Sequence, residues 1–377
     1  MQIVEVKAGD TLWALSRRYA TTVEALAYDN QLADPGRLTP GQSLVVPGGS
    51  GCACRSAEVN AYAYPNIAPA VLEEMLPYLT ALCPFSWRFT AEGELIPLDD
   101  RGLIVSAYTA DTAPMLTLTN IGADGGFSSE LGHALLTDRA VQDKVLEGLV
   151  AAIRERDHYG LNLNLEYLYP FDRDAYSAFV ARCAERLHPL GCPVSTAIAP
   201  KESAGQEGFL YAAHDYEAHG RYADRVILMT YEWGYTFGTP QAISPVDRIR
   251  KVLDYAVTVI PRRKILLGIS NYAYDWTLPW KQGTAARILS DAAAVELAVS
   301  RGAEIKFDEK AAAPWFNYVD AEGKTHVVWF EDARSVLARL RLVEEYGLAG
   351  ISIWTANQRN RPLFKVLESL YSVEKLF

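Results

Sequence analysis

Apolar and polar residues alternate strictly in segment 161–167, whose sequence is L-N-L-N-L-E-Y. A period of two places the leucines on one face of a β-strand and Asn162, Asn164 and Glu166 on the other. Helical patterns flank the segment, as is typical of a parallel α/β sheet, where strands are usually apolar on both faces. Three polar side chains ending in a carboxylic acid therefore indicate a chemical site. The alternative is a half-exposed antiparallel strand with its asparagines in water.

From residue 57 to residue 377, strand-like and helix-like patterns alternate. The expected strands are 59–64, 84–89, 114–120, 161–167, 193–198, 225–231, 264–270 and 350–354. The clearest expected helices are 138–156, 174–188, 245–258 and 332–346. Eight strands with intervening helices predict an α/β fold of the (β/α)₈ TIM barrel type, with its chemistry at the C-terminal strand ends. The longest gap contains 307–330, which predicts a small inserted β-hairpin subdomain.

Residues 1–47 predict a separate small β-α-α-β domain. A short alternating strand comes first, and Asp10 is placed to cap the helix that follows. Residues 48–56, G-G-S-G-C-A-C-R-S, have the composition of a flexible linker. We therefore expect three parts: 1–47, the linker 48–56 and a barrel over 57–377.

Composition narrows the class of partner. The chain has 377 residues, a formal charge of −10 and a pI near 5.2, which disfavour nucleic acid and anionic membranes as partners. We see no secretory signal and no apolar run long enough to span a bilayer, so we expect a protein made in the cytoplasm. Its five cysteines show no metal-ligand spacing, so we expect no bound metal. We also expect no cofactor, and we expect the protein to be a monomer.

The N-terminal domain resembles a LysM module along its whole length. The resemblance is carried by the G-D-T-L turn, N-Q-L after the second helix and the ending P-G-Q-S-L-V-V-P. LysM modules bind N-acetylglucosamine polymers such as peptidoglycan and chitin. The resemblance implies a sugar groove lined by Asp10, Thr11 and Leu12 on one side and Leu38 on the other. Asp10 and Thr11 could instead only cap the helix, and both roles are compatible.

Three strands of the barrel resemble the motifs of family 18 glycoside hydrolases. G-L-N-L-N-L-E resembles the D-x-x-D-x-D-x-E signature, I-L-M-T-Y-E-W-G the M-x-Y-D strand, and G-I-S-I-W the closing tryptophan strand. The variants A-P-K at 199–201 and N-Y-A-Y-D-W-T-L-P-W at 271–280 are similar to the spore-cortex branch, the LysM-bearing N-acetylglucosaminidases of endospore-forming bacteria. The resemblance covers nearly the whole chain.

This resemblance implies substrate-assisted hydrolysis, in which the sugar's own 2-acetamido group attacks the anomeric carbon. Glu166 matches the acid that protonates the glycosidic oxygen. Tyr231 matches the tyrosine that bonds the acetamido carbonyl, and Trp354 the ring beneath the sugar. The less favoured alternatives are that Tyr231 and Trp354 are packing residues of the barrel and that Glu166 is a structural acid.

The signature departs from the family at Asn164, where the family has an aspartate that orients the acetamido N–H and stabilises the positive intermediate. An asparagine oxygen still accepts that hydrogen bond but brings no charge. Losing one preorganised electrostatic group typically costs about 10²–10³ in rate. We expect Asn164 to be catalytic with attenuated activity, and Asn162, Glu232 and Asn120 to bind substrate.

Two classes of function stay open. The first is a hydrolase of N-acetylglucosamine linkages in spore cortex peptidoglycan, anchored by the LysM domain and associated with the spore. The second is a non-hydrolytic peptidoglycan- or chitin-binding lectin on the same barrel, and a chitinase is a further alternative. The retained acid Glu166 favours the enzyme.

Overall fold

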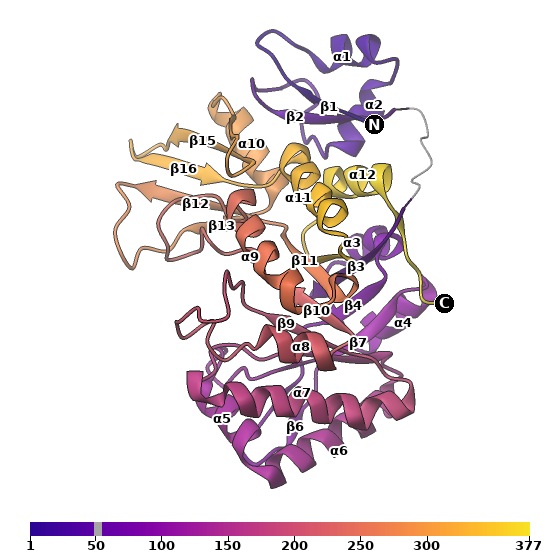
Figure 1. Ribbon diagram of the computed structural model, residues 1–377. Helices are drawn as coiled ribbons and strands as arrows, with labels where there is room; N and C mark the ends of the chain where they lie inside the picture. The colour runs from indigo at the N-terminus through magenta and orange to yellow at the C-terminus, as the bar shows by residue number, and fades with distance from the viewer. Residues whose placement is uncertain (49–54) are drawn as a thin grey trace.

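The computed structural model describes residues 1–48 and 55–377, and most of the expected linker lies outside these residues. Figure 1 shows a small N-terminal unit seated beside a larger barrel. Within the described residues, no helix is both long and apolar enough to cross a membrane.

The N-terminal unit has the expected β-α-α-β order. Its elements are β1 (Gln2–Glu5), α1 (Leu12–Arg18), α2 (Val23–Asp29) and β2 (Ser43–Val46). The two strands pair antiparallel, and the unit has its own small apolar core. Thr11, rather than Asp10, caps α1, because its hydroxyl accepts the backbone N–H of Ala14 at 3.1 Å. Asp10 accepts the backbone N–H of Lys7 instead.

Eight parallel strands close into a barrel, which confirms the expected fold. In the order of their pairing they are β3 (Ser56–Ala63), β4 (Ala81–Pro84), β7 (Ala113–Thr119), β8 (Gly160–Asn164), β9 (Val194–Ile198), β10 (Arg225–Leu228), β11 (Ile265–Ser270) and β17 (Gly350–Trp354). Pairing of β17 with β3 closes the ring, and β18 (Ser372–Val373) adds to the outer edge of β3.

Helices cover the outside of the barrel (Figure 1). They are α3 (Pro69–Met75), α4 (Arg101–Thr109), α5 (Ser129–Thr137), α6 (Arg139–Arg156), α7 (Arg173–Leu187), α8 (Tyr216–Tyr222), α9 (Val246–Val259), α11 (Ala333–Tyr346) and α12 (Arg361–Leu370). In the described residues four 3₁₀ turns lie between a helix and a barrel strand: η1 (Leu76–Tyr78), η2 (Pro170–Asp172), η3 (His188–Leu190) and η4 (Arg262–Lys264).

The alternation in β8 separates core from chemistry as expected. Leu161 and Leu163 are fully buried in the main apolar core, which the strands form with the covering helices. Asn162 instead faces the barrel interior, where it bonds side chains of β3 and β9. The antiparallel alternative for this strand is therefore wrong.

The second barrel strand is the one misplaced prediction among the eight. The structure has it at Ala81–Pro84, not 84–89. The regular strand ends at Pro84, although Trp87 still makes an isolated parallel bridge to Leu118 of β7. The chain then forms β5 (Arg88–Phe89), which pairs antiparallel with β6 (Leu95–Ile96). An apolar run alone does not mark where a buried strand ends.

The insertion before β17 is larger than the expected hairpin. A hairpin is present as β15 (Ala313–Val319) and β16 (Thr325–Trp329). It forms part of a five-stranded sheet with β12 (Ala273–Leu278), β13 (Arg287–Leu289) and β14 (Lys306–Asp308), accompanied by α10 (Asp291–Arg301). This sheet has a separate apolar core between its strands and α10.

The N-terminal unit is docked on the insertion and on α12. The backbone N–H of Ile305 donates to the Pro40 carbonyl at 2.9 Å, and the Gln31 amide donates to the Arg359 carbonyl at 3.1 Å. At Gly41, with φ +80°, a Cβ would lie 1.8 Å from the Ile305 carbonyl oxygen. Only glycine therefore permits this close approach of the two units.

Candidate active site

An open cavity of about 520 Å³ lies at the C-terminal end of the barrel strands. Five of the residues expected to form the site line it: Asn164, Glu166, Tyr231, Glu232 and Trp354. They come from the ends of β8, β10 and β17, where a barrel of this kind places its chemistry. The cavity thus brings together residues almost two hundred positions apart in the sequence.

Glu166 follows the end of β8, and its own peptide is held firmly. The Asn120 side chain accepts the Glu166 backbone N–H at 2.9 Å and donates to the Glu166 carbonyl at 2.8 Å. Asn120 is fully buried just after β7. This two-point contact fixes the start of the Glu166 side chain relative to the neighbouring strand.

The environment of the Glu166 carboxyl raises its pKa and so favours the protonated form. Burial raises its pKa to about 7, the charge of Glu232 adds to the rise, and a hydrogen bond from Asn164 opposes it. A carboxyl with this pKa is substantially protonated near neutral pH, and it retains a useful driving force for proton transfer. These are the properties required of a general acid.

Asn164 is buried beside this acid with one atom unused. Its Oδ1 has no hydrogen-bond partner although the residue is only 2% exposed. A buried acceptor without a partner costs free energy unless a ligand or a water satisfies it. Because the side chain lines the cavity, Oδ1 is available to an N–H group of a bound molecule.

Tyr231 and Glu232 follow β10 on the wall beyond Asn164. Gly268 on β11 makes room for the Tyr231 ring, because a Cβ there would lie 2.9 Å from Tyr231 Cε1. Glu232 accepts hydrogen bonds from the hydroxyls of Tyr272 and Tyr274, the latter at 2.9 Å. Enclosure of the Glu232 carboxylate raises its pKa, and the two tyrosine hydroxyls lower it. The insertion therefore holds Glu232 in place.

Trp354, at the end of β17, is surrounded edge-on by three rings. Its ring centroid lies 4.9 Å from that of Phe85, 5.3 Å from Tyr62 and 5.9 Å from Tyr64. Edge-to-face packing of this kind fixes the orientation of an aromatic ring. The geometry provides a rigid apolar surface within the cavity.

Asn162 and Asn120 are not among the residues that line the cavity, and the expectation that they bind substrate stays a prediction. Asn162 is fully buried, accepts from the Tyr62 hydroxyl at 3.0 Å and donates to Ser195 Oγ at 2.8 Å. Asn120 is used by the backbone of Glu166, as described above. Both asparagines position other groups, because their amides are occupied by partners within the protein.

His214 is a positioning residue that the sequence patterns did not reveal. The Ala199 backbone N–H donates to His214 Nδ1 at 3.0 Å, so Nε2 carries the proton and donates to the Leu165 carbonyl at 3.1 Å. Burial lowers the pKa of His214 to about 4, which keeps the ring neutral as this bridge requires. His214 thus ties the end of β9 to the residue preceding Glu166. Its own carbonyl accepts from Lys201 Nζ.

The expected sugar-binding residues of the N-terminal unit are placed unevenly. The Leu12 side chain is 2% exposed and belongs to the unit's core, so only its backbone could meet a ligand. The Thr11 hydroxyl is occupied as a helix cap. Asp10 and Leu38 are half-buried, and Arg37, next to Leu38, reaches the Val299 carbonyl of α10 at 3.2 Å. Binding of glycan by this turn and loop stays a prediction.

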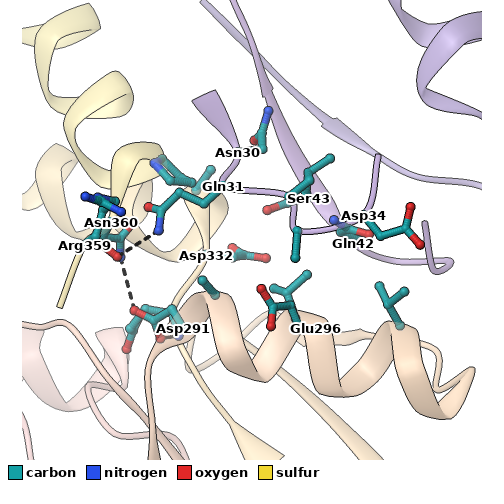
Figure 2. Close-up of a pocket in the computed structure, with 18 of the residues that line it drawn as sticks. Asn30, Gln31, Asp34, Gln42, Ser43, Asp291, Glu296, Asp332, Arg359 and Asn360 are labelled. Atoms are coloured by element: carbon teal, nitrogen blue, oxygen red, sulfur yellow. Dashed lines mark hydrogen bonds between the residues drawn. The ribbon is translucent and has the colours of Figure 1, made fainter. Parts of the chain in front are cut away.

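A second cavity of about 210 Å³ lies in the seam between the two units. Figure 2 shows Gln31 and Asp34 of the N-terminal unit facing Asp291 and Glu296 of α10 across it. Its lining does not overlap that of the barrel-mouth cavity. We assign the chemistry to the mouth, where an acid of raised pKa and an unsatisfied acceptor meet. In the described ranges no group of His, Cys, Asp and Glu could hold a metal ion.

Comparison with known proteins agrees with this geometry. Residues 110–358 match the model of glycosyl hydrolases family 18, and residues 4–47 match the LysM domain. The chain is 41% identical to the cortical fragment-lytic enzyme of Bacillus subtilis (strain 168) over 94% of both chains. The crystal structure of the Bacillus cereus spore cortex-lytic enzyme SleL matches with a TM-score of 0.93 at 33% identity, covering 99% of this chain and 98% of that one. A chitinase from Chromobacterium violaceum matches with a TM-score of 0.78 at 26% identity, covering 84% and 100% of the respective chains.

Proposed function

Because the chain belongs to glycosyl hydrolase family 18 and carries a LysM domain, we propose that it hydrolyses N-acetylglucosamine linkages in spore cortex peptidoglycan. Relatives that align over almost their whole length are named for cortical fragments and for the spore cortex, which supports this substrate and an association with the spore. The chain is a glycosidase by family, and the substrate is the part proposed here.

One observation carries the proposal: Glu166, with a pKa of about 7, stands beside the unsatisfied buried oxygen of Asn164. The first group donates a proton near neutral pH, and the second accepts a hydrogen bond from a substrate N–H. An N-acetylated sugar offers both complementary groups, namely a glycosidic oxygen and an acetamido N–H.

In the first step the protonated Glu166 donates its proton to the glycosidic oxygen, and the bond from this oxygen to the anomeric carbon breaks. The acetamido carbonyl oxygen forms the new bond to the anomeric carbon, which gives a cyclic positive intermediate. Asn164 Oδ1 accepts the acetamido N–H, Tyr231 donates to the acetamido oxygen, and Trp354 lies beneath the sugar. In the second step water attacks the anomeric carbon, the bond from the acetamido oxygen to that carbon breaks and restores the acetamido group, and the Glu166 carboxylate takes the proton of the water.

We further propose that the LysM domain anchors the enzyme to the same polymer. The turn at Asp10 and the loop at Leu38 are both partly accessible, which supports a glycan contact there. Retention on insoluble peptidoglycan, compared between the full chain and a chain starting at residue 57, tests the anchor. Equal retention of the two proteins would contradict it.

The proposed activity is tested by incubating the full chain with purified cortex fragments and identifying the new reducing ends by mass spectrometry. We expect reducing N-acetylglucosamine ends and, with Glu166→Gln, none. Binding of fragments without product by the unsubstituted chain would favour the non-hydrolytic lectin, for which the uncharged Asn164 is the supporting observation. Faster cleavage of chitin oligomers than of cortex fragments would favour a chitinase.

A further inference from the structure

The cavity in the seam between the two units, which we call the seam cavity, is a separate place for a ligand. The α2–β2 loop and the start of β2 form one wall, and α10, the start of α11 and the turn before α12 form the other (Figure 2). Its volume of about 210 Å³ lies below that of a pocket for a drug-sized ligand. It therefore has room for a group the size of one amino-acid residue, not for a polymer chain. Neither the turn at Asp10 nor Leu38 lines it, so it is not the glycan groove that the LysM resemblance implies.

Three of the five carboxyl groups that line the seam cavity are already compensated within the protein. Burial raises the pKa of Asp291 well above its usual range, and the charge of Glu331 adds to the rise, which favours the neutral form of Asp291. Glu331 pairs with Arg339 at 3.0 Å, and Asp332 pairs with Arg334 at 2.7 Å. These three groups therefore leave no net charge for a ligand to balance.

Asp34 and Glu296 are the two carboxylates that remain. They extend towards the seam cavity from its opposite walls, one from the N-terminal unit and one from α10 (Figure 2). The two arginines of the lining are used elsewhere, because Arg359 pairs with Glu74 at 2.9 Å and Arg37 donates to a backbone carbonyl of α10 at 3.2 Å. Within residues 1–48 and 55–377, neither Asp34 nor Glu296 forms an ion pair. A cation that enters the seam cavity would balance both charges.

Gln42 provides a second and independent sign of a ligand. Its side chain is 2% exposed and lines the seam cavity. Its Oε1 accepts the Thr39 backbone N–H at 3.2 Å, whereas its Nε2 donates to no group in the part of the chain that the structure describes. A buried donor without an acceptor costs free energy unless a ligand or a water satisfies it. The rest of the wall is largely apolar, with Leu32, Ala33, Val295, Val299 and Pro362.

We propose that the seam cavity binds a primary ammonium group on a short peptide branch of the peptidoglycan, with the ammonium between Asp34 and Glu296 and a peptide carbonyl at Gln42 Nε2. This inference rests on the proposed function, because it takes peptidoglycan, whose glycan strands carry short peptides, as the polymer. The hydrocarbon stem of an amino side chain suits the apolar wall. A plain sugar would leave both carboxylates without a cation, and an anion would be repelled by them.

The position of the seam cavity gives such binding a consequence. Asp34 and Gln42 belong to the N-terminal unit and Glu296 to the insertion, so the complete site exists only while the two units are docked. A ligand that binds only the docked form stabilises it. The peptide branch would therefore hold the LysM domain and the barrel together on the same polymer.

The first test uses two small probes on the full chain. Nα-acetyl-lysine methylamide carries a primary ammonium and two amide carbonyls, and Nα-acetyl-norleucine methylamide lacks only the ammonium. In calorimetry at low salt the lysine probe should bind about tenfold more tightly. Asp34→Asn combined with Glu296→Gln should remove this difference, since each exposed ion pair contributes about threefold in affinity. Gln42→Leu should weaken the binding of both probes, because both contain the carbonyl.

Glu147→Gln is the matched control for charge. Glu147 is exposed on α6, which lies on the far side of the barrel from the N-terminal unit (Figure 1). Equal affinity for the two probes, a difference that persists in the double variant, or a loss that Glu147→Gln reproduces would overturn the seam site.

The second test identifies the source of the ammonium group. Glu166→Gln protein, which is expected not to cleave, is titrated with a peptidoglycan disaccharide that carries a peptide with a free side-chain amine, and with the same compound acetylated on that amine. The free amine should increase affinity about tenfold, and the double variant should lose this gain. A seam that binds the lysine probe but gives no gain with the peptide branch would overturn the peptidoglycan assignment. Cleavage of cortex fragments is assayed separately, so its failure contradicts the proposed function and leaves these binding results standing.

Discussion

Substituting Asn164 by aspartate should change the titration of Glu166 in a calculable direction. In an extended chain the Cα atoms of residues two apart are about 7 Å apart, and the side chains of Asn164 and Glu166 lie closer than this because they interact. A like charge therefore costs at least about 2.4 kcal/mol at an effective dielectric constant of about 20. This energy corresponds to about 1.7 pKa units. The Asn164 hydrogen bond that lowers the pKa of Glu166 is also lost. Both changes raise the pKa of Glu166, which should therefore increase from about 7 by about two units or more.

The same substitution should raise the maximum rate. An aspartate at this position stabilises the positive intermediate but not the neutral substrate, so kcat should increase while affinity changes little. An electrostatic group preorganised in this way is typically worth about 10²–10³ in rate. The alkaline limb of the plot of kcat/KM against pH should move to higher pH as the pKa of Glu166 rises, because activity requires the protonated acid.

The assay is the initial rate of cortex-fragment cleavage from acidic to alkaline pH. Asn317→Asp on the exposed face of β15 is the control, since it adds the same charge to the chain away from the cavity. An alkaline limb that does not move would mean that Asn164 and Glu166 do not interact as described. If the alkaline limb moves but the maximum rate is unchanged, the negative charge of Glu232 already stabilises the positive intermediate.

Three further outcomes are expected. Glu166→Gln should abolish turnover and leave fragment affinity within about twofold, because proton donation acts in the transition state; equal losses of rate and affinity would contradict this. His214 has a pKa of about 4 when folded, below its unfolded value, so it makes stability rise by up to about 1.4 kcal/mol per pH unit between about 4 and 6.5. His214→Gln should remove that contribution in urea unfolding, and an unchanged slope would disprove the assignment. Cutting the chain within 48–56 should leave the units associated, as size-exclusion chromatography would show, and immediate separation would refute a docked LysM domain. Arg361→Ala removes the contact with Tyr28 at 3.7 Å and should weaken this association, while the contacts of Pro40 and Gln31 remain.

The barrel could be predicted because seven of its strands are recognisable in the sequence as short apolar or alternating segments between helical patterns. The strand at 161–167 was clearest, since its asparagines face the interior of the barrel and its leucines the helices. The second strand was misplaced because Phe85 and Trp87 continue the apolar run after the regular strand has ended at Pro84. The insertion was underestimated because β12 follows β11 almost directly, and its alternation resembles an extension of that strand.

The five cavity residues were foreseeable for a related reason. Each lies at or just after the C-terminal end of a barrel strand, and these ends meet at one mouth of the barrel. The amides of Asn120 and Asn162 already have partners within the protein, which residue type does not reveal, and their contact with substrate stays a prediction. His214 could not be found at all, since it lies in an irregular loop and its partner Leu165 is 49 positions away.

These positioning residues explain how a loop residue serves as a precise acid. The N–H and the carbonyl of Glu166 are both bonded by Asn120, and the preceding carbonyl, that of Leu165, is bonded by His214. The peptide of the acid is therefore fixed from the β7 side and from the β9 side at once. Its carboxyl can then lie in a poorly solvated position, which is the main cause of its raised pKa, without the backbone moving to relieve that cost. The acid strength of Glu166 thus depends on two side chains that need not touch the substrate.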